Sequence, residues 1–381
     1  MNGDKFVFLH LITAHHKAMT PGVLRYYREN FDLSEHKFCI LRNNPVQECW
    51  YEFQAREMNV DVRMAPERSV QSLLRFFFFL GQFDVVVMHG RYLSPRVLVW
   101  MPILAPSLVR KTVLIGFGQD IYEWNEHSRN RITSFLKVTM LRVFHEHLRA
   151  FIGIFPSDIE QFKSQFGGQC PCFYAPYSLR SRKNWDSPPF SPHESMAERQ
   201  QQGKPIRILV GHRCVSVLKH ESVLRRLSRF AEENIQVVVP QGQCVGAYAE
   251  SIHALGKRLF NEKFLFLDHF LNKVELENLA ANTDIAIFDA DMQIALATIG
   301  FLFRNGVKIF LPSGSPMERV FSGAGVPVGP LDKLDTMSFQ EFAQDVDPLP
   351  GYQFYRDFSD PETNLQRWKA IYKALRNREE K

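Results

Sequence analysis

Residues with the chemistry of a phosphate site follow a short β-branched run at 206–210. Gly211 ends this run, and His212 and Arg213 come directly after it. In sheets of parallel strands, ligands bind at the carboxyl ends of the strands, where a glycine lets the backbone approach a ligand closely. His212 and Arg213 could neutralise phosphate oxygens there, and His220 follows nine residues after the glycine. The alternative interpretation is a solvated basic loop without a ligand.

A second loop leaves the next expected strand, 236–239, and contains Pro240 and Gly242. Tyr248 stands at the start of the helix expected after this loop, over 248–259. Because successive strands in an α/β domain run parallel, this loop opens at the same sheet edge as the first one. Convergence of separate loops on one edge is stronger evidence for a ligand site than any single motif.

The third segment joins an expected strand at 284–288 to a helix at 294–305 that ends at Gly306, a residue typical of a helix C-terminus. Gln293 and Thr298 lie near the start of that helix. A helix start carries unsatisfied N–H groups and the positive end of the helix dipole, which suit a pyrophosphate. The alternative is a helix packed closely on the sheet through its small residues, Ala295, Ala297 and Gly300.

Carboxylates and histidines also follow strands expected in the N-terminal half. Asp120 and Glu123 come after the strand at 113–116, and either one could act as a general base. His89 ends another expected strand and could orient a substrate hydroxyl, although a histidine in this place is as often structural. Two further histidines follow the first strand and are expected to be structural, His15 and His16.

Short apolar runs alternate with amphipathic segments along the whole chain. This alternation predicts an α/β fold in which helices cover both faces of doubly wound parallel sheets. The strands expected in the N-terminal half are 6–11, 37–41, 85–89, 113–116 and 151–155, and the helices are 22–30, 69–80 and 132–148. The elements expected in the C-terminal half are strands 206–210, 236–239, 264–267, 284–288 and 307–311, and helices 221–233, 248–259, 273–281 and 294–305.

Length and a change of composition predict two domains. A chain of 381 residues exceeds the size at which one core continues to grow. Residues 186–204, rich in Pro, Ser, Glu and Gln, indicate a linker between a domain at 1–185 and another at 205–345. The segment 346–381 is expected to form a tail helix that could cross back to the first domain. Two Rossmann-like domains facing a central cleft are the arrangement called GT-B.

The charge distribution limits the classes of partner that the protein is expected to bind. The first 180 residues hold 21 basic and 16 acidic residues, whereas the remainder holds 25 of each. A basic N-terminal half favours an anionic partner on that side, such as a membrane phospholipid or a pyrophosphate-linked lipid. No zinc finger, paired RNA-binding aromatics or long basic arm favours nucleic acid, so we expect no nucleic-acid partner.

Targeting and redox signals favour the cytoplasm. The six cysteines form no CxxC pairs, which is typical of a reducing compartment. Residues 1–10 lack a signal-peptide pattern, and the longest apolar stretch, 97–109, is too short to span a bilayer. The phenylalanine run 76–79 predicts either core packing or a surface that meets lipid. The amphipathic stretch 129–149 could lie on an acidic bilayer, although a helix with a solvated basic face explains the same pattern.

Several of these segments resemble the Fuc4NAc transferases of enterobacterial common antigen synthesis, the TDP-N-acetylfucosamine:lipid II N-acetylfucosaminyltransferases of glycosyltransferase family 56. The motifs that carry the likeness in the C-terminal half are Ile208-Leu209-Val210-Gly211 with His220, Val237-Val238-Val239-Pro240-x-Gly242, Ala247-Tyr248, and Gln293 with Thr298 and Gly306. Those in the N-terminal half are Gly118-x-Asp120-Ile121-Tyr122-Glu123, His89-Gly90 and the run 23–27. Most of residues 5–310 is covered. The sequence departs from the family at His212-Arg213, which replaces Asn-Ser, and at Ala295 and Ala297, which replace glycines.

The resemblance implies a GT-B enzyme that transfers an amino-deoxy sugar from a dTDP-type donor to a polyprenyl-pyrophosphate-linked saccharide. It implies a peripheral location on the inner face of the cytoplasmic membrane, with the acceptor on the N-terminal domain. As a hypothesis, Asp120 or Glu123 activates the acceptor hydroxyl and His89 positions it. The residues that would hold the donor diphosphate are Gly211, Arg213, Gln293 and Thr298. Alternatives are a sugar-nucleotide epimerase, a transferase to a protein side chain, and an inactive GT-B module that binds a nucleotide or a partner.

Two Asp-x-Asp patterns could instead indicate a metal-dependent transferase of the GT-A type, in which such a pair holds the metal that bridges the diphosphate. Asp289-Ala290-Asp291 has this spacing, but it lies late in the second α/β domain. Asp345-Val346-Asp347, in a loop bounded by prolines, shows how readily the pattern arises by chance. We therefore expect no metal ion and no cofactor, with the donor sugar nucleotide as a substrate.

Overall fold

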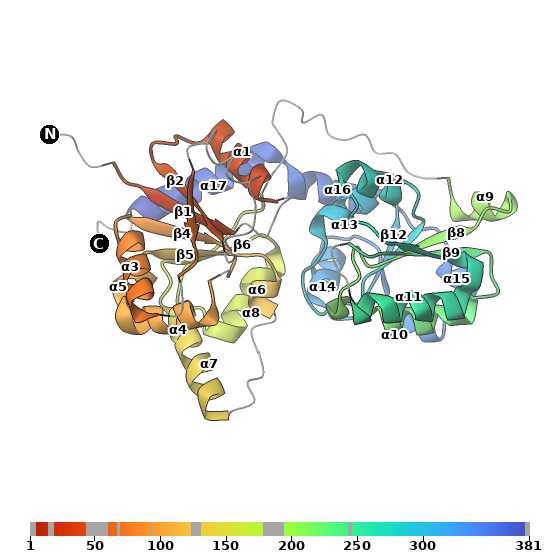
Figure 1. Cartoon of the computed structure of the whole chain (residues 1–381). Coiled ribbons are helices and arrows are strands. Elements are labelled where there is room, and N and C mark those ends of the chain that lie inside the picture. The colour runs from red at the N-terminus through yellow and green to blue at the C-terminus, as the bar shows by residue number, and fades with distance from the viewer. Residues whose placement is uncertain are drawn as a thin grey trace. The chain divides into compact units, whose positions relative to one another are not determined.

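The computed structural model describes residues 5–13, 19–42, 60–66, 69–91, 93–122, 131–177, 194–242 and 246–377 (Figure 1). The chain divides into two compact units. The first unit comprises Met1–Trp185 together with Ser359–Lys381, and the second comprises Asp186–Phe358. Each unit is built around one sheet, and all the strand pairs are parallel, which confirms the predicted α/β class.

The first sheet has the strand order β3-β2-β1-β4-β5-β6-β7. Its strands are β1 Phe8–Thr13, β2 His36–Arg42, β3 Asp61–Met64, β4 Val85–His89, β5 Thr112–Gly116, β6 Ala150–Gly153 and β7 Cys172–Tyr174. β1 pairs with β2 on one side and with β4 on the other. The chain therefore reverses its direction of winding at β1, and such a switch point is where open α/β sheets bind ligands.

Helices cover both faces of this sheet (Figure 1). The helices of the first unit are α1 Met19–Asn30, α3 Val70–Gly81, α4 Pro95–Leu104, α5 Pro106–Lys111, α6 Gln119–Tyr122, α7 Arg131–Glu146, α8 Pro156–Phe166 and α17 Pro361–Arg376. Because side chains alternate along a strand, Leu9 and Leu11 join a core cluster with α3, α4, α5, α7 and α8, whereas Phe8 and Ile12 join another with α1 and α17. In α17 the buried Trp368 donates from its indole Nε1 to the carbonyl of Pro176 at 3.1 Å. The C-terminal helix thus completes the core of the first unit.

The second sheet has the strand order β10-β9-β8-β11-β12-β13. Its strands are β8 Ile206–Val210, β9 Ile235–Pro240, β10 Phe264–Leu267, β11 Ile285–Ile287, β12 Lys308–Leu311 and β13 Val328–Pro330. The helices of this unit are α9 Met196–Gln201, α10 His220–Leu227, α11 Ala247–Phe260, α12 Lys273–Ala281, α13 Leu296–Arg304, α14 Pro316–Gly323, α15 Phe339–Phe342 and α16 Leu349–Ser359. β8 pairs with β9 and with β11, so the switch point of this unit lies between β8 and β11.

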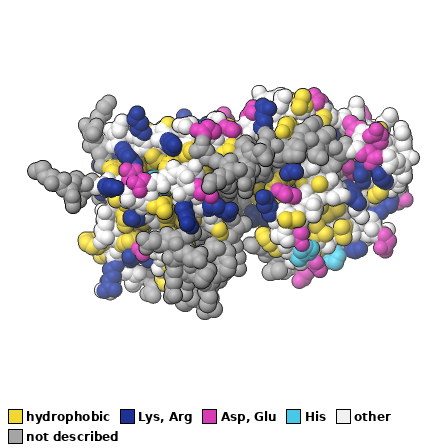
Figure 2. Space-filling view, turned by 90° about the horizontal axis from the view of Figure 1, so that it is seen from above, with side chains coloured by type: hydrophobic (Ala, Val, Ile, Leu, Met, Phe, Trp, Pro, Cys, Tyr) yellow, Lys and Arg dark blue, Asp and Glu magenta, His cyan; other side chains and the backbone are white. Residues whose placement is uncertain are grey.

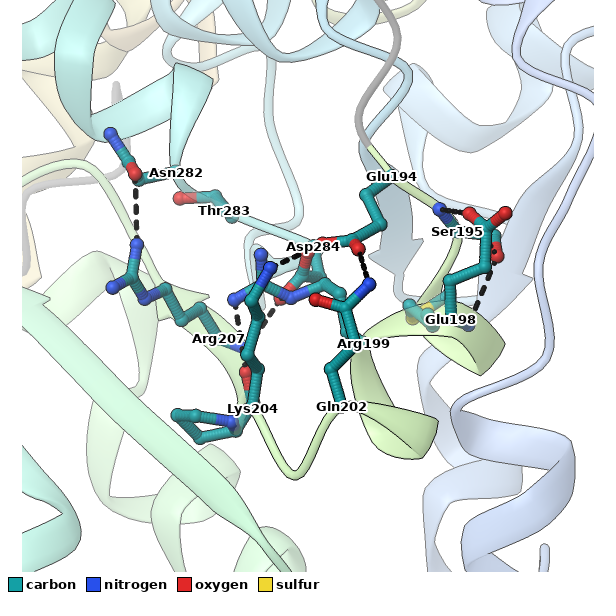
Figure 3. A network of polar contacts seen from close by, with 12 residues as sticks. Glu194, Ser195, Glu198, Arg199, Gln202, Lys204, Arg207, Asn282, Thr283 and Asp284 are labelled. Carbon is teal, nitrogen blue, oxygen red and sulfur yellow. Dashed lines mark hydrogen bonds and ion pairs between the residues drawn. The ribbon is translucent and has the colours of Figure 1, made fainter.

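Part of the segment predicted as a linker, 186–204, belongs to the fold of the second unit. Ser195 caps α9 with a capping box, and Met196 is buried in the core. Figure 3 shows how polar contacts tie this segment to the sheet. The buried carboxylate of Asp284 forms an ion pair with Arg199 at 3.2 Å and accepts a hydrogen bond of 2.7 Å from the backbone N–H of Arg207. The composition of 194–204 therefore reflects a surface helix and not a linker.

The phenylalanine run 76–79 divides between core and surface. Phe76, Phe77 and Phe79 are buried in the core on α3, whereas 75% of Phe78 is exposed. On the face seen in Figure 2, Lys and Arg side chains are scattered among hydrophobic and acidic ones over both units. Within the described ranges, no helix combines the length and the apolar character needed to cross a bilayer.

Candidate functional site

Three loops meet at the carboxyl edge of the second sheet, next to its switch point. Gly211 directly follows β8, and its N–H donates to the carbonyl of Ile287 in β11 at 2.9 Å. The loop after β9 joins them, because Cys214 N–H donates to the carbonyl of Gln241 at 3.1 Å. The third loop, after β11, leads to α13. The structure thus brings together the loops in which the sequence places the donor site.

Two glycines permit close packing in the first two loops. Gly211 has φ +68°, and a Cβ placed on it would lie 2.7 Å from Nε2 of His220. A Cβ placed on Gly242, which has φ +67°, would lie 2.7 Å from Cβ of Arg213 in the first loop. Larger residues would be strained by the backbone conformation and would meet these neighbours. The spacing between Gly211 and His220 therefore reflects direct packing of one on the other.

His220 is held by Tyr248, the aromatic residue at the start of α11. The backbone N–H of His220 donates to the Tyr248 hydroxyl at 3.3 Å, and its ring Nδ1 lies 3.2 Å from the same oxygen. Burial lowers the pKa of His220 to about 4, although the carbonyls of Val215 and Arg213 favour the charged form. His220 is therefore neutral near pH 7 and acts in this site as a packing and hydrogen-bonding group. Pro240, at the end of β9, is also buried.

Three side-chain atoms around these loops are buried without a hydrogen-bond partner in the described part of the chain. They are Nδ1 of His212, after β8, Nε2 of His220, which faces Gly211, and Oε1 of Gln293, after β11. Burial, with Arg213 and His220 nearby, lowers the pKa of His212 to about 3, so its ring is neutral. Only 7% of Gln293 is exposed. Leaving a buried polar atom unpaired costs about 1–3 kcal/mol, so each such atom calls for an explanation, such as a bound water or a functional role.

The start of α13 has an unusual backbone. Ala295 occupies the N-cap position with φ +59° and offers no side-chain hydrogen bond to the first turn. Thr298 lies in that first turn and is buried. Gly300 is a different case, because its face is covered by the ring of Tyr355 from α16. The small size of Gly300 therefore serves the packing of α13 against α16.

Asp289 and Asp291 are paired with a lysine in this structure. Lys219 Nζ lies 2.6 Å from Asp291 Oδ2 and 3.5 Å from Asp289 Oδ1. The pKa of Lys219 is raised mainly by its hydrogen bond to Asp291, and burial raises the pKa of Asp289. No group of three or more His, Cys, Asp or Glu that could hold a metal ion occurs in the described ranges.

A chain of buried histidines crosses the first sheet at its switch point. Ring nitrogens of His36 and His10 lie 2.9 Å apart, as do those of His10 and His89. The other nitrogen of His89, Nδ1, lies 2.9 Å from the hydroxyl of Tyr177. Burial lowers the pKa of His36 to about 4, that of His89 to about 3 and that of His10 well below its usual value. Three neutral rings thus connect β2, β1 and β4 to Tyr177.

This chain changes the expected part played by His89. Its ring is fully buried and both nitrogens are engaged, so in this conformation it reaches a substrate only through Tyr177. The sequence analysis missed His10, His36 and Tyr177, although a histidine inside the apolar run of β1 is a visible signal. Asp120 lies in α6, after Gly118 with φ +76°, but its side chain is outside the described residues. The same is true of three other residues singled out from the sequence, Glu123, His15 and His16.

Similarity to solved structures identifies the fold. The chain is similar to HepE from Anabaena in complex with UDP, with a TM-score of 0.65 at 12% identity over 97% of this chain and 100% of that one. It is also similar to WaaG, a glycosyltransferase involved in lipopolysaccharide biosynthesis, with a TM-score of 0.56 at 14% identity over 96% and 99% of the two chains. A third similar protein is sucrose-phosphate synthase from Thermosynechococcus elongatus, with a TM-score of 0.65 at 12% identity over 97% and 99%. Two parallel α/β units of this kind define the GT-B fold.

The particular family follows from the sequence. Residues 23–348 match the family model described as 4-alpha-L-fucosyltransferase, glycosyl transferase group 56. The chain therefore belongs to glycosyltransferase family 56 and is a glycosyltransferase, which confirms the resemblance drawn from its motifs.

Proposed function

We propose that the carboxyl edge of the second sheet binds the diphosphate and base of a nucleotide-sugar donor. The buried, unpartnered atoms Gln293 Oε1 and His212 Nδ1 carry this proposal, because they follow the two strands of the switch point. A neutral imidazole can accept from or donate to a ligand, and an amide oxygen accepts from an N–H or hydroxyl. The uncapped start of α13 and the guanidinium of Arg213 supply the positive potential that a diphosphate requires.

The donor is a nucleotide diphosphate sugar, and a dTDP-linked amino-deoxy sugar fits the family best. HepE binds UDP and UDP-glucose, which supports a nucleotide sugar in the same architecture. During transfer, negative charge develops on the leaving diphosphate. The donors at this edge, Arg213 and the first turn of α13, would stabilise that charge without a metal ion.

The acceptor is a polyprenyl-pyrophosphate-linked or other membrane-bound glycan that meets the first unit. A protein acting on such an acceptor lies at the inner face of the cytoplasmic membrane, and the excess of basic residues in 1–180 favours an anionic surface there. Asp120 or Glu123 would remove the proton of the acceptor hydroxyl. His89 would act through Tyr177, whose hydroxyl it holds at 2.9 Å.

Replacing Gln293 by leucine tests the donor site. A leucine removes the unpartnered amide oxygen, so the free protein should become no less stable, and it should become up to about 1 kcal/mol more stable if the volume is accommodated. Donor binding should weaken about tenfold, because one ligand hydrogen bond is lost. Gln366→Leu, at an exposed position on α17, is the matched control. Unchanged affinity for dTDP and UDP in calorimetric titrations would exclude Gln293 from the site.

Replacing Asp120 by asparagine tests the catalytic base. The Asp120→Asn variant should bind the donor normally and lose transfer, because the amide cannot accept the hydroxyl proton. Donor hydrolysis and product analysis with donor alone separate transfer from epimerisation, which needs no acceptor. Turnover retained in this variant would remove Asp120 from the mechanism and leave Glu123 as the candidate. A thermal-shift screen of sugar nucleotides would identify the base and sugar that the site prefers.

A further inference from the structure

One side of the first unit exposes large apolar side chains from two neighbouring helices. On α3, Val70, Leu74 and Phe78 recur every four residues and form one exposed stripe along the helix. On α4, 46% of Trp100 and 52% of Ile103 are exposed. α3 contacts both α4 and α5, so these side chains lie on the same side of the unit. We call the exposed surface of α3, α4 and α5 the apolar face.

The charges on the apolar face have one sign. No Asp or Glu occurs within α3, α4 or α5, and the exposed charged side chains are Arg75, Arg96 and Arg110, one from each helix. The one acidic residue in the segments that join these helices is Asp84. Its carboxylate accepts a hydrogen bond of 2.7 Å from the backbone N–H of Val7. Apolar side chains mixed with arginines, without acidic residues, are typical of a surface that enters the headgroup region of an anionic bilayer.

A cavity beside the stripe adds a place for an anionic group. It has a volume of about 480 Å³ and lies between β3 and the start of α3. Arg63 and Arg75 line it from opposite elements, and the rings of Phe76 and Phe79 line its apolar part. The guanidinium of Arg63 stacks on the ring of Phe79 at 3.7 Å and lies 3.6 Å from the carboxylate of Asp61, so part of its charge is already balanced and Arg75 is the main cation of the cavity. A phosphate with acyl chains next to it matches this combination.

We propose that the apolar face docks the first unit on an anionic phospholipid bilayer, with the stripe of α3 and Trp100 inserted among the headgroups. The proposal rests on the membrane-bound acceptor of the proposed function and names the surface that would bring the enzyme to it. A second copy of the chain fits this face less well, because a symmetric contact would set like arginines against each other. α4 starts a few residues after His89, so its first turn lies near the carboxyl end of β4, and Trp100 and Ile103 lie further along the helix.

Vesicle binding with three sets of variants tests the proposal. The full chain is mixed with vesicles of phosphatidylglycerol and phosphatidylcholine in equal parts, or of phosphatidylcholine alone, and the bound fraction is measured by co-sedimentation. Leu74→Asp with Phe78→Asp should abolish binding, whereas Phe270→Asp, at an aromatic of the second unit that is 55% exposed, should not change it. Each of Arg75→Ala, Arg96→Ala and Arg110→Ala should weaken binding about fivefold. Lys257→Ala, at an exposed lysine of α11, is their matched control.

Trp100 provides a direct probe of insertion. Phospholipids brominated on their acyl chains should quench tryptophan fluorescence of the bound protein, and the Trp100→Phe variant should lose that quenching while its vesicle binding falls only slightly. Binding without quenching of Trp100 would overturn the proposal, as would equal binding of the wild type and the Leu74→Asp, Phe78→Asp variant. A dimer in sedimentation velocity that this double variant disperses would assign the face to a second copy instead.

Activity with a short-chain acceptor in detergent separates this proposal from the proposed function. The double variant should transfer sugar to that acceptor at the wild-type rate and lose activity only when the acceptor is embedded in vesicles. If the wild-type protein transferred no sugar in either condition, the proposed function would be refuted, and the vesicle-binding result would still stand. Normal transfer in vesicles by the double variant would refute the docking surface alone.

Discussion

Substitution of Gly211 by alanine tests whether packing of His220 against this glycine defines the loop after β8. At φ +68° an alanine is strained by about 1 kcal/mol relative to glycine. Its Cβ would also lie 2.7 Å from His220 Nε2 and 3.1 Å from Leu218 Cδ1. Both neighbours are buried, so relieving the contact requires a shift that costs about 1–3 kcal/mol more. We expect a total loss of about 2–4 kcal/mol.

The control for this variant is Gly314→Ala. Gly314 has nearly the same backbone conformation, φ +71°, but a Cβ there would meet no atom within 4 Å. This variant should therefore lose only the conformational part, about 1 kcal/mol. Urea unfolding curves of both variants, followed by circular dichroism, give the two free energies of unfolding. Their difference isolates the contact with His220.

A double-mutant cycle completes the test. His220→Ala removes the ring that the alanine at 211 would meet. In the His220→Ala background, the loss of stability caused by Gly211→Ala should therefore be about 1–2 kcal/mol smaller than in the wild type. Donor affinity should fall in Gly211→Ala and stay normal in Gly314→Ala. Equal destabilisation by the two glycine substitutions, with no coupling to His220, would refute the packing argument.

Two further predictions concern stability. Folding lowers the pKa values of several buried histidines below their usual value of 6.5, so below that pH the folded protein binds fewer protons than the unfolded chain. The free energy of unfolding should therefore be highest above pH 6.5 and should fall as the pH drops towards 3–4, by up to about 1.4 kcal/mol per pH unit for each histidine. Urea unfolding at a series of pH values would measure this decrease. The histidines concerned are His36, His89, His145, His212 and His220. Asp284→Ala leaves the partly buried Arg199 without its partner and should destabilise the second unit by about 3–5 kcal/mol, whereas Asp268→Ala, at an exposed aspartate, should have little effect in the same assay.

Several regular elements of the second unit were predictable because residues close together in the sequence determine their bounds. The expected strand at 206–210, the strand at 264–267 and the helix at 273–281 have the bounds observed for β8, β10 and α12. In α12, Asn272 and Glu275 form a capping box, a signal visible within four residues of sequence. Of the four edge strands, β10 was predicted, whereas the other three, β3, β7 and β13, gave no such signal and were missed. Their few residues are placed by pairing with a neighbouring strand and not by their own periodicity.

Parts of the site that depend on distant residues could not be predicted. The sequence around Gly300 does not show whether a ligand or an aromatic ring covers this glycine. The structure shows that the ring of Tyr355 from α16 covers it. Likewise, His36, His10 and His89 are far apart in sequence and become neighbours because β2, β1 and β4 are adjacent in the sheet. The sequence identifies which residues end strands, but strand order decides which of them meet.

The two switch points share a construction in which a glycine stands beside a neutral histidine. In each unit a strand ends at a glycine with positive φ whose N–H donates to a neighbouring strand: Gly90 to Ile115 at 3.0 Å and Gly211 to Ile287 at 2.9 Å. A buried histidine, His89 or His220, stands beside each glycine and hydrogen-bonds a tyrosine. A neutral ring can pair with a hydroxyl either as donor or as acceptor, whereas a charged ring can only donate. Protonation would therefore break the pairing with Tyr177 and Tyr248, and because the same protonation favours unfolding, loss of both proposed substrate sites should accompany acid unfolding of the units.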